Sequence, residues 1–275
     1  MIIDAHQHFW QYHPVKDAWI TDDMKVIQED FLPHHLQPVL QENGVDGCVA
    51  VQADQSETET GFLLDLAAQH NFIKGVVGWV DLRADNLSER LEHFSRFEKL
   101  KGFRHIVQGE PDPAFILRSD FCEGIQALSK YNFTYDILVY PVQLPAVAAF
   151  VQLFPNQRLV IDHMAKPYFK TGDISVWETH MRAIAEHPHV YCKLSGLVTE
   201  ADWQKWDAAH FTPFLDVVLE AFGPERLMFG SDWPVCKLAA SYTEVIRIVT
   251  DYISRLSANE KAAIMGGNAV RFYGL

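Results

Sequence analysis

The chain alternates between short apolar runs and longer segments in which apolar residues recur every three or four positions. The short runs are rich in β-branched residues and cover 2–3, 45–51, 72–80, 102–107, 133–139, 158–161, 190–194 and 226–229. Such short, nearly continuous apolar runs are typical of strands that are buried on both faces of a parallel sheet. The pattern therefore predicts eight parallel strands.

The segments between these runs have the pattern of amphipathic helices. Five are clear from their apolar spacing, at 32–44, 57–71, 86–99, 119–132 and 144–156. They end at residues that stop helices, such as Gly44 or Pro155 and Asn156. Strands that alternate with helices indicate an α/β fold. Because eight strands are expected, and no internal repeat or linker is evident, we predict a single (β/α)8 TIM-barrel domain over 1–275.

Two of the segments that join a predicted strand to the next helix are longer than a minimal strand–helix connection. The first covers 8–30 and contains several tryptophans, and the second covers 166–180. Both follow predicted strands, so they are expected at the carboxyl-terminal face of the barrel, where binding sites lie. We expect these segments to form lids or walls of a substrate site.

Composition narrows the class of protein. The 275 residues are 48% hydrophobic, which is enough for the core of one barrel, and the net charge of -13 argues against nucleic-acid binding. The four scattered cysteines include no CxxC pair, which indicates free thiols in a reducing compartment. Polar residues interrupt the N-terminal apolar run, and no apolar stretch is long enough to span a membrane. A cytoplasmic protein is expected.

Polar residues gather at the predicted carboxyl ends of the strands. His6 and His8 are two positions apart, so both rings project from one face of the first strand. The other strand ends contribute Arg104, His105, Asp136, Asp162, His163, Lys166, Lys193, Ser195 and Asp232. If the barrel closes, these groups converge on one mouth, and converging titratable groups indicate a functional site.

Several of these positions lie in stretches that resemble a known family. "DAHQHFW", "GFRH", "DHMAKP", "KLSG", "FGSDWP" and the terminal "GGNAVRFYGL" occur in that order over nearly the whole chain. Together they resemble the amidohydrolase superfamily, in particular its amidohydrolase-2 branch, which contains sugar-acid lactonases of the L-fuconolactonase and L-rhamnono-lactonase kind. The resemblance implies a hydrolase that opens a sugar-derived lactone to its aldonic acid.

The resemblance also implies roles for catalytic residues. Asp232 would be the general base that activates water and later protonates the leaving oxygen. His163, Arg104 and Lys193 would orient the water or stabilise the carbonyl oxygen. Each residue also has a structural alternative. Asp232 would be an ordinary turn residue, His163 a buried structural histidine, and the two cations ion-pair partners of Asp136 or Asp162.

Four further residues are expected to contact the substrate. His105 and Lys166 would bind hydroxyl groups, and Trp10 and Trp233 would stack on the apolar face of a sugar ring. Packing in the loops and the core is the alternative for the tryptophans. Cys236 follows Asp232 closely, but no neighbouring base accompanies it, so we expect no covalent role for this thiol.

A metal ion is implied by the resemblance, with an alternative. His6, His8 and Asp232 would hold one divalent cation, zinc by preference, with water as the fourth ligand. Relatives that bind one metal firmly usually add a histidine at strand five, where this chain has Asp136. A metal-independent site is therefore the second interpretation, in which His6 and His8 hydrogen-bond the lactone directly.

Other functions compete with lactone hydrolysis. One alternative is hydrolysis of a pyrone-type lactone acid or metal-dependent decarboxylation of an aromatic acid on the same scaffold. The other is a carbohydrate-binding protein without activity. For the leading interpretation the partner is a small sugar lactone, with neither nucleic acid nor membrane, and the chain would act as a monomer or a homodimer.

Overall fold

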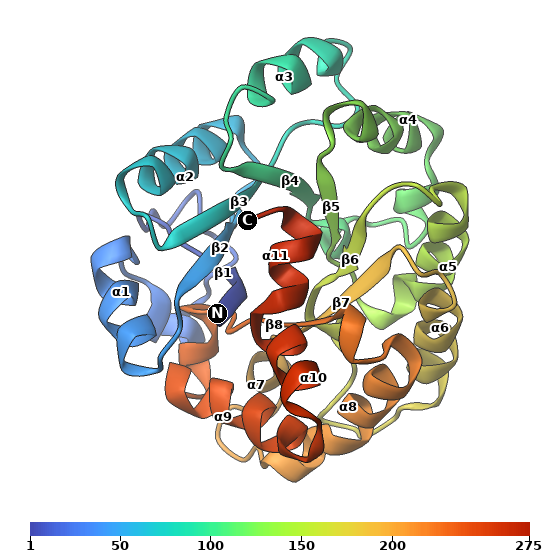
Figure 1. The fold of residues 1–275 in the computed structure, drawn as a ribbon. Coiled ribbons are helices and arrows are strands. Elements are labelled where there is room, and N and C mark those ends of the chain that lie inside the picture. Colours follow the sequence, from blue (N-terminus) through green and yellow to red (C-terminus); the bar gives the residue numbers. More distant parts are fainter.

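A computed structural model describes residues 1–275 and contains one eight-stranded parallel sheet with its strands in sequence order. The strands are β1 (Ile3–Gln7), β2 (Gly47–Val51), β3 (Ile73–Gly78), β4 (Leu100–His105), β5 (Thr134–Ile137), β6 (Leu159–Ile161), β7 (Val190–Leu194) and β8 (Leu227–Phe229). Each falls on or beside an apolar run that predicted it. The sheet curls into a nearly closed barrel, as Figure 1 shows, and the predicted (β/α)8 architecture is confirmed.

The barrel closes between β1 and the residues that follow β8. The backbone N–H of Asp232 donates to His6 O over 2.8 Å, and that of His8 donates to Trp233 O over 2.7 Å. Gln7 and Trp233 form an isolated parallel bridge. This seam places the end of the first strand beside the loop after the last one.

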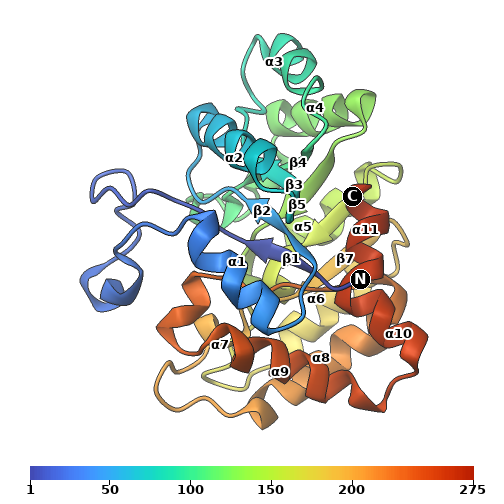
Figure 2. The ribbon, with the colours of Figure 1, turned by 60° about the vertical axis from the view of Figure 1, so that its left-hand side comes forward.

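Helices surround the barrel in Figures 1 and 2. They are α1 (Pro33–Glu42), α2 (Glu57–Gln69), α3 (Leu87–Phe94), α4 (Ser119–Leu128), α5 (Leu144–Leu153), α6 (Ser175–Ala185), α7 (Leu197–Glu200), α8 (Ala208–Phe222), α9 (Tyr242–Tyr252), α10 (Ala258–Ala262) and α11 (Asn268–Tyr273). The five helices predicted from apolar spacing correspond to α1 to α5. No range was predicted for α6 to α11, and α6 begins within the segment 166–180, which was predicted to be a long connection.

The amino-terminal end of the barrel is covered by α11, which lies across its opening in Figure 1. Ala269, Phe272 and Tyr273 pack in one cluster with strand residues that point into the barrel, such as Val49 and Val160. The Tyr273 hydroxyl also donates to Asp136 Oδ2 over 2.8 Å. The C-terminal segment of the chain therefore closes the amino-terminal end of the barrel. The opposite end, formed by the C-terminal ends of the strands, stays open for a site.

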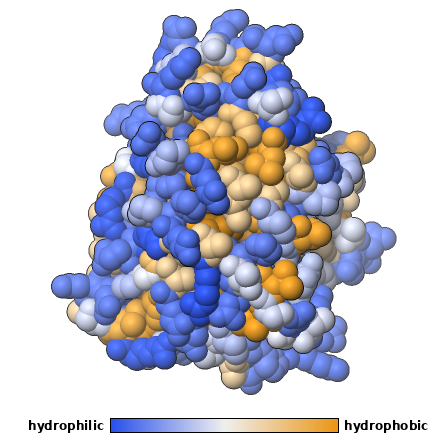
Figure 3. Space-filling view, turned by 90° about the vertical axis from the view of Figure 1, so that its right-hand side faces the viewer, coloured by the Kyte–Doolittle hydropathy of each residue, from blue (hydrophilic) through white to orange (hydrophobic).

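The outer surface carries exposed apolar side chains as well as charged ones. Figure 3 shows orange patches among hydrophilic residues on the side of α4 to α6. Val142, Leu153 and Val176 are large exposed side chains from this side, with 59–62% of their surface accessible. No helix has both the length and the apolar character that a membrane span requires.

Candidate active site

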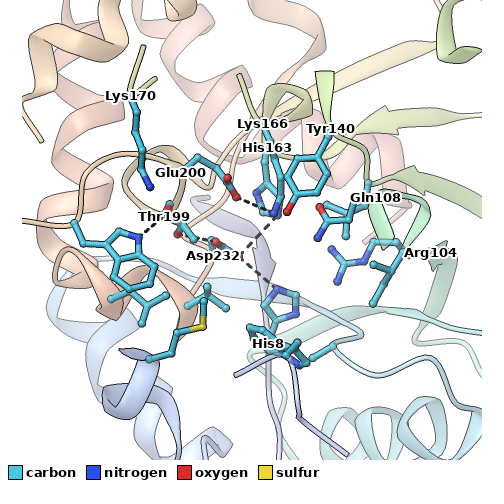
Figure 4. A pocket seen from close by; sticks show the side chains of 18 residues that line it. His8, Arg104, Gln108, Tyr140, His163, Lys166, Lys170, Thr199, Glu200 and Asp232 are labelled. Carbon is cyan, nitrogen blue, oxygen red and sulfur yellow. Dashed lines mark hydrogen bonds and ion pairs between the residues drawn. The ribbon is translucent and has the colours of Figure 1, made fainter. Parts of the chain in front are cut away.

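A cavity of about 460 Å³ opens at the carboxyl-terminal end of the barrel. Trp19 and Met24 line it from the first long connection, and Lys170 lines it from the second. Both long connections therefore form part of the cavity wall. The cavity floor carries His8, His163 and Asp232, together with other polar side chains that Figure 4 labels.

Three histidines surround one oxygen of Asp232. Asp232 Oδ1 lies 3.5 Å from His8 Nε2, 3.9 Å from His163 Nε2 and 4.0 Å from His6 Nε2. The rings of His6 in β1 and His8 just after it meet edge-on, with 3.2 Å between His6 Nε2 and His8 Nε2. The histidines and Asp232 come from β1, from the turn after β6 and from the loop after β8, so closure of the barrel brings them together.

The backbone after β6 adopts an unusual conformation to present His163. His163, Met164, Ala165 and Lys166 all have left-handed φ values, between 50 and 56°. A left-handed conformation costs roughly 1–2 kcal/mol for a residue that is not glycine. The buried indole of Trp177 donates to Met164 O over 2.7 Å and so supports this turn. Strain of this kind is concentrated at functional sites.

Glycines in two of the motifs make room for the histidine rings. A Cβ atom at Gly196 would lie 2.7 Å from His163 Nδ1, and one at Gly230 would lie 2.7 Å from His6 Cβ. These separations are too short for non-bonded atoms, so a side chain at either position would displace a ring. The glycines of "KLSG" and "FGSD" are therefore explained by packing against the site.

Asp4 fixes the loop that carries Asp232. Its carboxylate accepts from the Ser231 backbone N–H over 2.9 Å, the Ser231 hydroxyl over 2.6 Å and the Tyr242 hydroxyl over 3.1 Å. Asp232 itself has a left-handed φ of 58°. Because Ser231 is bound on both its backbone and side chain, the direction of Asp232 is set by the interior of the barrel.

A network of buried charges lies beneath the cavity. Lys193 Nζ is 2.6 Å from Asp136 Oδ2, 2.9 Å from Asp162 Oδ1 and 3.2 Å from His6 Nδ1. Arg104 Nη1 is 3.0 Å from Asp162 Oδ2 and 3.2 Å from His6 Nε2. Two cations and two carboxylates thus neutralise one another around His6, which a buried ionic cluster requires.

Burial and neighbouring charges set the protonation of the site. Burial lowers the pKa of His163 to about 4 and lowers the pKa of His6 well below its ordinary value. Burial alone would raise the pKa of Asp232, but the surrounding imidazoles, His163 above all, stabilise the ionised carboxylate and hold that pKa below its usual range. Near neutral pH the site therefore combines neutral His6 and His163 with an ionised carboxylate.

Half of the ten predicted site residues line the cavity. His8, Arg104, His163, Lys166 and Asp232 line it. His6 lies directly behind, with no accessible surface.

Other predicted residues do not line the cavity. Lys193 is fully buried in the ionic network. His105 Nε2 is 2.7 Å from Glu110 Oε1, which satisfies the ring away from the cavity. Trp10 packs edge-on against Trp19 and Phe31, and Trp233 packs against Phe9 and Phe31. For Lys193 and the two tryptophans these positions match the structural alternatives, because each side chain is satisfied by protein neighbours. Cys236 is also fully buried, and burial raises its thiol pKa well above the ordinary value.

Several lining residues were missed from the sequence. Gln108 and Tyr140 come from the loops after β4 and β5, and Thr199, Glu200 and Trp203 come from α7 and the residues after it. Thr199 Oγ1 donates to Asp232 Oδ2 over 3.0 Å. Glu200 Oε1 is 2.8 Å from Lys166 Nζ. The only signal in the sequence was that Thr199 and Glu200 follow closely after "KLSG".

The donor set suits a divalent cation. Ligand atoms of His6, His8 and Asp232 all lie within 4.8 Å of one another, and a second group consists of His6, Asp162 and His163. His8 Nδ1 lies 2.8 Å from Val51 O and donates to it, which leaves Nε2 with its lone pair toward Asp232. A second-sphere hydrogen bond of this kind is usual for metal-binding histidines. Two imidazoles and one carboxylate are typical zinc ligands.

Comparison with known proteins defines the class. Residues 3–275 match the amidohydrolase family, and the chain therefore belongs to that family. It is an enzyme of the hydrolase class, as the motifs predicted.

Two relatives and one solved structure are particularly similar. The L-fucono-1,5-lactonase of Burkholderia multivorans is 46% identical, over 99% of this chain and 96% of its own length. The L-fucono-1,5-lactonase of Burkholderia ambifaria is 37% identical, over 98% and 94% of the two lengths. A crystal structure of a Burkholderia multivorans amidohydrolase with bound zinc has a TM-score of 0.97 and 46% identity, covering 100% of this chain and 99% of that one.

Proposed function

We propose that this enzyme hydrolyses a sugar-derived lactone, an aldono-lactone of the L-fucono or L-rhamnono type, to the aldonic acid, and that residues 1–275 act as one catalytic domain. The observation that carries the proposal is the cluster of Asp232 with His6, His8 and His163 at the floor of the cavity. The two lactonase relatives, similar over nearly their whole lengths, support the same substrate class.

Asp232 acts as the general base. Its carboxylate takes a proton from a water molecule whose oxygen attacks the lactone carbonyl, and the resulting tetrahedral intermediate carries the negative charge on the former carbonyl oxygen. The carbon–oxygen bond of the ring then breaks, and Asp232 returns the proton to the departing alkoxide. One water is consumed, and the products are a carboxylic acid and a hydroxyl group on the same chain.

His163 and Arg104 stabilise the charge that develops on the carbonyl oxygen. His163 Nδ1 lies 2.8 Å from Ser195 Oγ, and when this hydroxyl donates to Nδ1, the proton of the neutral ring is on Nε2 and faces the cavity. Arg104, which Asp162 holds in place, adds guanidinium N–H groups at the cavity wall. Donors that are held in place before the reaction begins supply a large part of enzymatic rate enhancement.

Lys193 acts as a positioning residue. It has no accessible surface, and it contacts His6 Nδ1 and Asp162 rather than the cavity. Its charge keeps Asp162 ionised, and Asp162 in turn holds both His6 and Arg104. Removal of Lys193 therefore disturbs two groups of the site through the network.

His6, His8 and Asp232 would hold a zinc ion if one is bound. Zinc at this position supplies polarisation of the carbonyl and a lower pKa for a bound water. The proton transfer at Asp232 and the orientation by His163 are functions of the chain's own residues. The relative of known structure that contains zinc supports the binding of this metal.

The charge of the cavity favours a neutral lactone over a pyrone dicarboxylate or an aromatic acid. Arg104 is paired with Asp162 and Lys166 with Glu200, so two of the three cations at the cavity are already neutralised. Lys170 is the third lining cation. An acid with two carboxylates would require more unpaired positive charge than this wall offers.

An assay of acid release tests the proposal. A panel of five- and six-membered aldonolactones is incubated with the enzyme, before and after chelator treatment, and proton release is followed with a pH indicator. Turnover of one stereochemical group is expected. Turnover of pyrone or aromatic acids alone, or binding of sugar lactones without any turnover, would contradict it.

A further inference from the structure

The short helix α7 places two polar side chains at the cavity, next to each other in sequence and with different partners. Thr199 binds Asp232, whereas Glu200 forms an ion pair with Lys166 from the left-handed turn after β6. Figure 4 shows this ion pair near Tyr140, away from His8 and Arg104. The reacting carbonyl belongs at Asp232 in the proposed function, so Glu200 and Lys166 face another part of the substrate.

The ion pair retains capacity for further hydrogen bonds. Glu200 has 22% of its side chain exposed and Lys166 has 13%, and both line the cavity. Lys166 is the sole ion-pair partner of Glu200, through Oε1. A carboxylate has about four acceptor positions and an ammonium three donors, so both groups can bind a ligand while they stay paired.

The position of Lys166 is fixed from several directions. Its backbone is in the left-handed turn at φ 50°, and its ammonium group lies 5.3 Å from the ring centroid of Tyr140. The α7 backbone is held as well, because the Trp203 indole donates to Thr199 O over 2.8 Å. A donor and an acceptor 2.8 Å apart are therefore presented at a constant separation.

We propose that Glu200 and Lys166 hydrogen-bond two neighbouring hydroxyl groups on the lactone ring and so select the configuration of both. One hydroxyl donates to Glu200 and its neighbour accepts from Lys166, so the pair selects aldonolactones in which both hydroxyls lie on the side that faces it. Inversion or loss of either hydroxyl leaves a charged group of the enzyme without its ligand partner. Sites that bind a substrate hydroxyl in this way reject analogues strongly, because their polar groups are then left unpaired.

This inference rests on the proposed function and extends it to specificity. It assigns the choice between sugar epimers to Glu200, a residue outside the Asp232 cluster, and to its partner Lys166. The apolar lining residues, such as Met24 and Leu238, contact the less polar parts of the ring and cannot distinguish hydroxyl orientation.

The test compares wild-type enzyme with Glu200→Gln and Lys166→Met. For each, kcat and KM are measured with the best lactone of the panel, with its epimers at each ring hydroxyl and with the corresponding deoxy lactones. We expect kcat/KM of Glu200→Gln to fall about 100-fold for the best lactone. For the epimer inverted at the hydroxyl that binds Glu200, and for the matching deoxy lactone, kcat/KM of Glu200→Gln should differ from that of wild type by less than about threefold. For Lys166→Met we expect the same pattern of kcat/KM values, with the epimer and the deoxy lactone altered at the adjacent hydroxyl.

Glu57→Gln is the matched control. It breaks the Glu57–Arg90 ion pair, whose groups are about as exposed as Glu200 but lie outside the cavity. This control should keep the wild-type selectivity. Circular dichroism and thermal melting establish that each variant is folded, and Lys166→Met serves as the independent variant if Glu200→Gln does not fold.

Two results would overturn the inference. One is an equal loss of kcat/KM for every lactone, which would mean that the ion pair only supports the structure. The other is unchanged selectivity in both variants. Failure of the wild-type enzyme to hydrolyse any lactone would instead contradict the proposed function, so the two failures are distinguishable.

Discussion

The Thr199 hydroxyl donates a 3.0 Å hydrogen bond to Oδ2 of Asp232, while Oδ1 of the same carboxylate faces the three histidines. One oxygen is thus bound to the protein and the other is directed at the reacting groups. A carboxylate held by one oxygen loses rotational freedom, and a fixed base is more effective than a mobile one. Thr199 is therefore a positioning residue for the proposed base.

Removal of the Thr199 hydroxyl should lower kcat with little change in KM. Thr199→Val keeps the shape of the side chain but lacks the donor, and we expect kcat to fall about 10-fold, as for loss of one hydrogen bond to a charged group. Thr199→Ser should restore most of the rate, because it supplies the hydroxyl again. Steady-state kinetics with the best lactone measure both. Equal rates for the Val and Ser variants would contradict this role.

Asp232→Asn should remove catalysis and preserve binding. The amide has nearly the same shape but cannot accept the proton of water, so we expect kcat to fall by about 10³-fold or more. Product or lactone binding to the chelator-treated proteins, measured by calorimetry, should stay within about threefold of wild type, since without metal only proton transfer is removed. Activity near the wild-type level would disprove the assignment of Asp232 as general base.

Zinc should bind at His6, His8 and Asp232 with one ion per chain, and His8→Ala should abolish this binding. Arg104 Nη1 lies 3.2 Å from His6 Nε2, so its fixed positive charge opposes a cation there. Arg104→Met should therefore bind zinc about 10-fold more tightly, a change expected when one nearby like charge is removed. Titration followed by elemental analysis measures stoichiometry and affinity. Zinc binding in His8→Ala equal to that of wild type would refute this ligand set.

The activity of the metal-free enzyme then decides between the two roles of the histidine pair. Loss of rate on chelation, restored by zinc, would assign water activation to the metal. Full activity without metal would assign His6 and His8 to direct hydrogen bonds with the lactone.

Loss of Lys193 should destabilise the fold. Lys193→Met leaves Asp136 and Asp162 buried without their shared cation, which typically costs about 3–5 kcal/mol in the free energy of unfolding. The double variant Lys193→Met with Asp136→Asn removes one of the two carboxylate charges and should recover part of that loss. Urea unfolding measures both. A double variant less stable than Lys193→Met would show that charge imbalance is not the cause.

Glu59 should make stability depend on pH between about 4.5 and 7. Burial raises its pKa from 4.5 to about 7, so in this interval the folded state holds a proton that the unfolded state has released. The free energy of unfolding contributed by Glu59 is therefore fully present below pH 4.5 and falls as the pH rises toward 7. The fall amounts to at most about 3 kcal/mol.

Glu59→Gln provides the matched comparison for this pH dependence. The amide does not titrate, so the variant should lack this part of the decline in unfolding free energy between pH 4.5 and 7. Urea unfolding at several pH values measures the difference. An identical slope in wild type and variant would contradict the shifted pKa of Glu59.

Much of the fold followed from the sequence because its causes are local. Runs such as 45–51 and 190–194 are apolar at most positions, as strands buried on both faces require, and they contain β2 and β7. The helices α1 to α5 have clear stop residues. The later helices were not assigned, although α9 begins with a capping box from Ser241 to Glu244 that the sequence contains.

The motifs also determined which residues end up at the carboxyl ends of the strands. His6 lies near the end of β1, and His8, His163 and Asp232 follow strands within a few residues, so closure of the barrel brings them together. Arg104 and Lys193 were identified as strand-end cations in the same way. For such residues, position along a strand is enough to predict position in the barrel.

What each residue contacts was decided only by the tertiary structure. Lys193 and Arg104 lie near the ends of similar strands, yet Lys193 is buried in the ionic network whereas Arg104 lines the cavity. The difference arises because burial depends on the neighbouring strands and on α11 beneath them. Thr199 and Glu200 have no strand to fix their direction, and their partners Asp232 and Lys166 are 33 and 34 positions away. The sequence by itself determined the barrel and the cluster of histidines with Asp232, whereas the cavity walls depend on loop packing between distant segments.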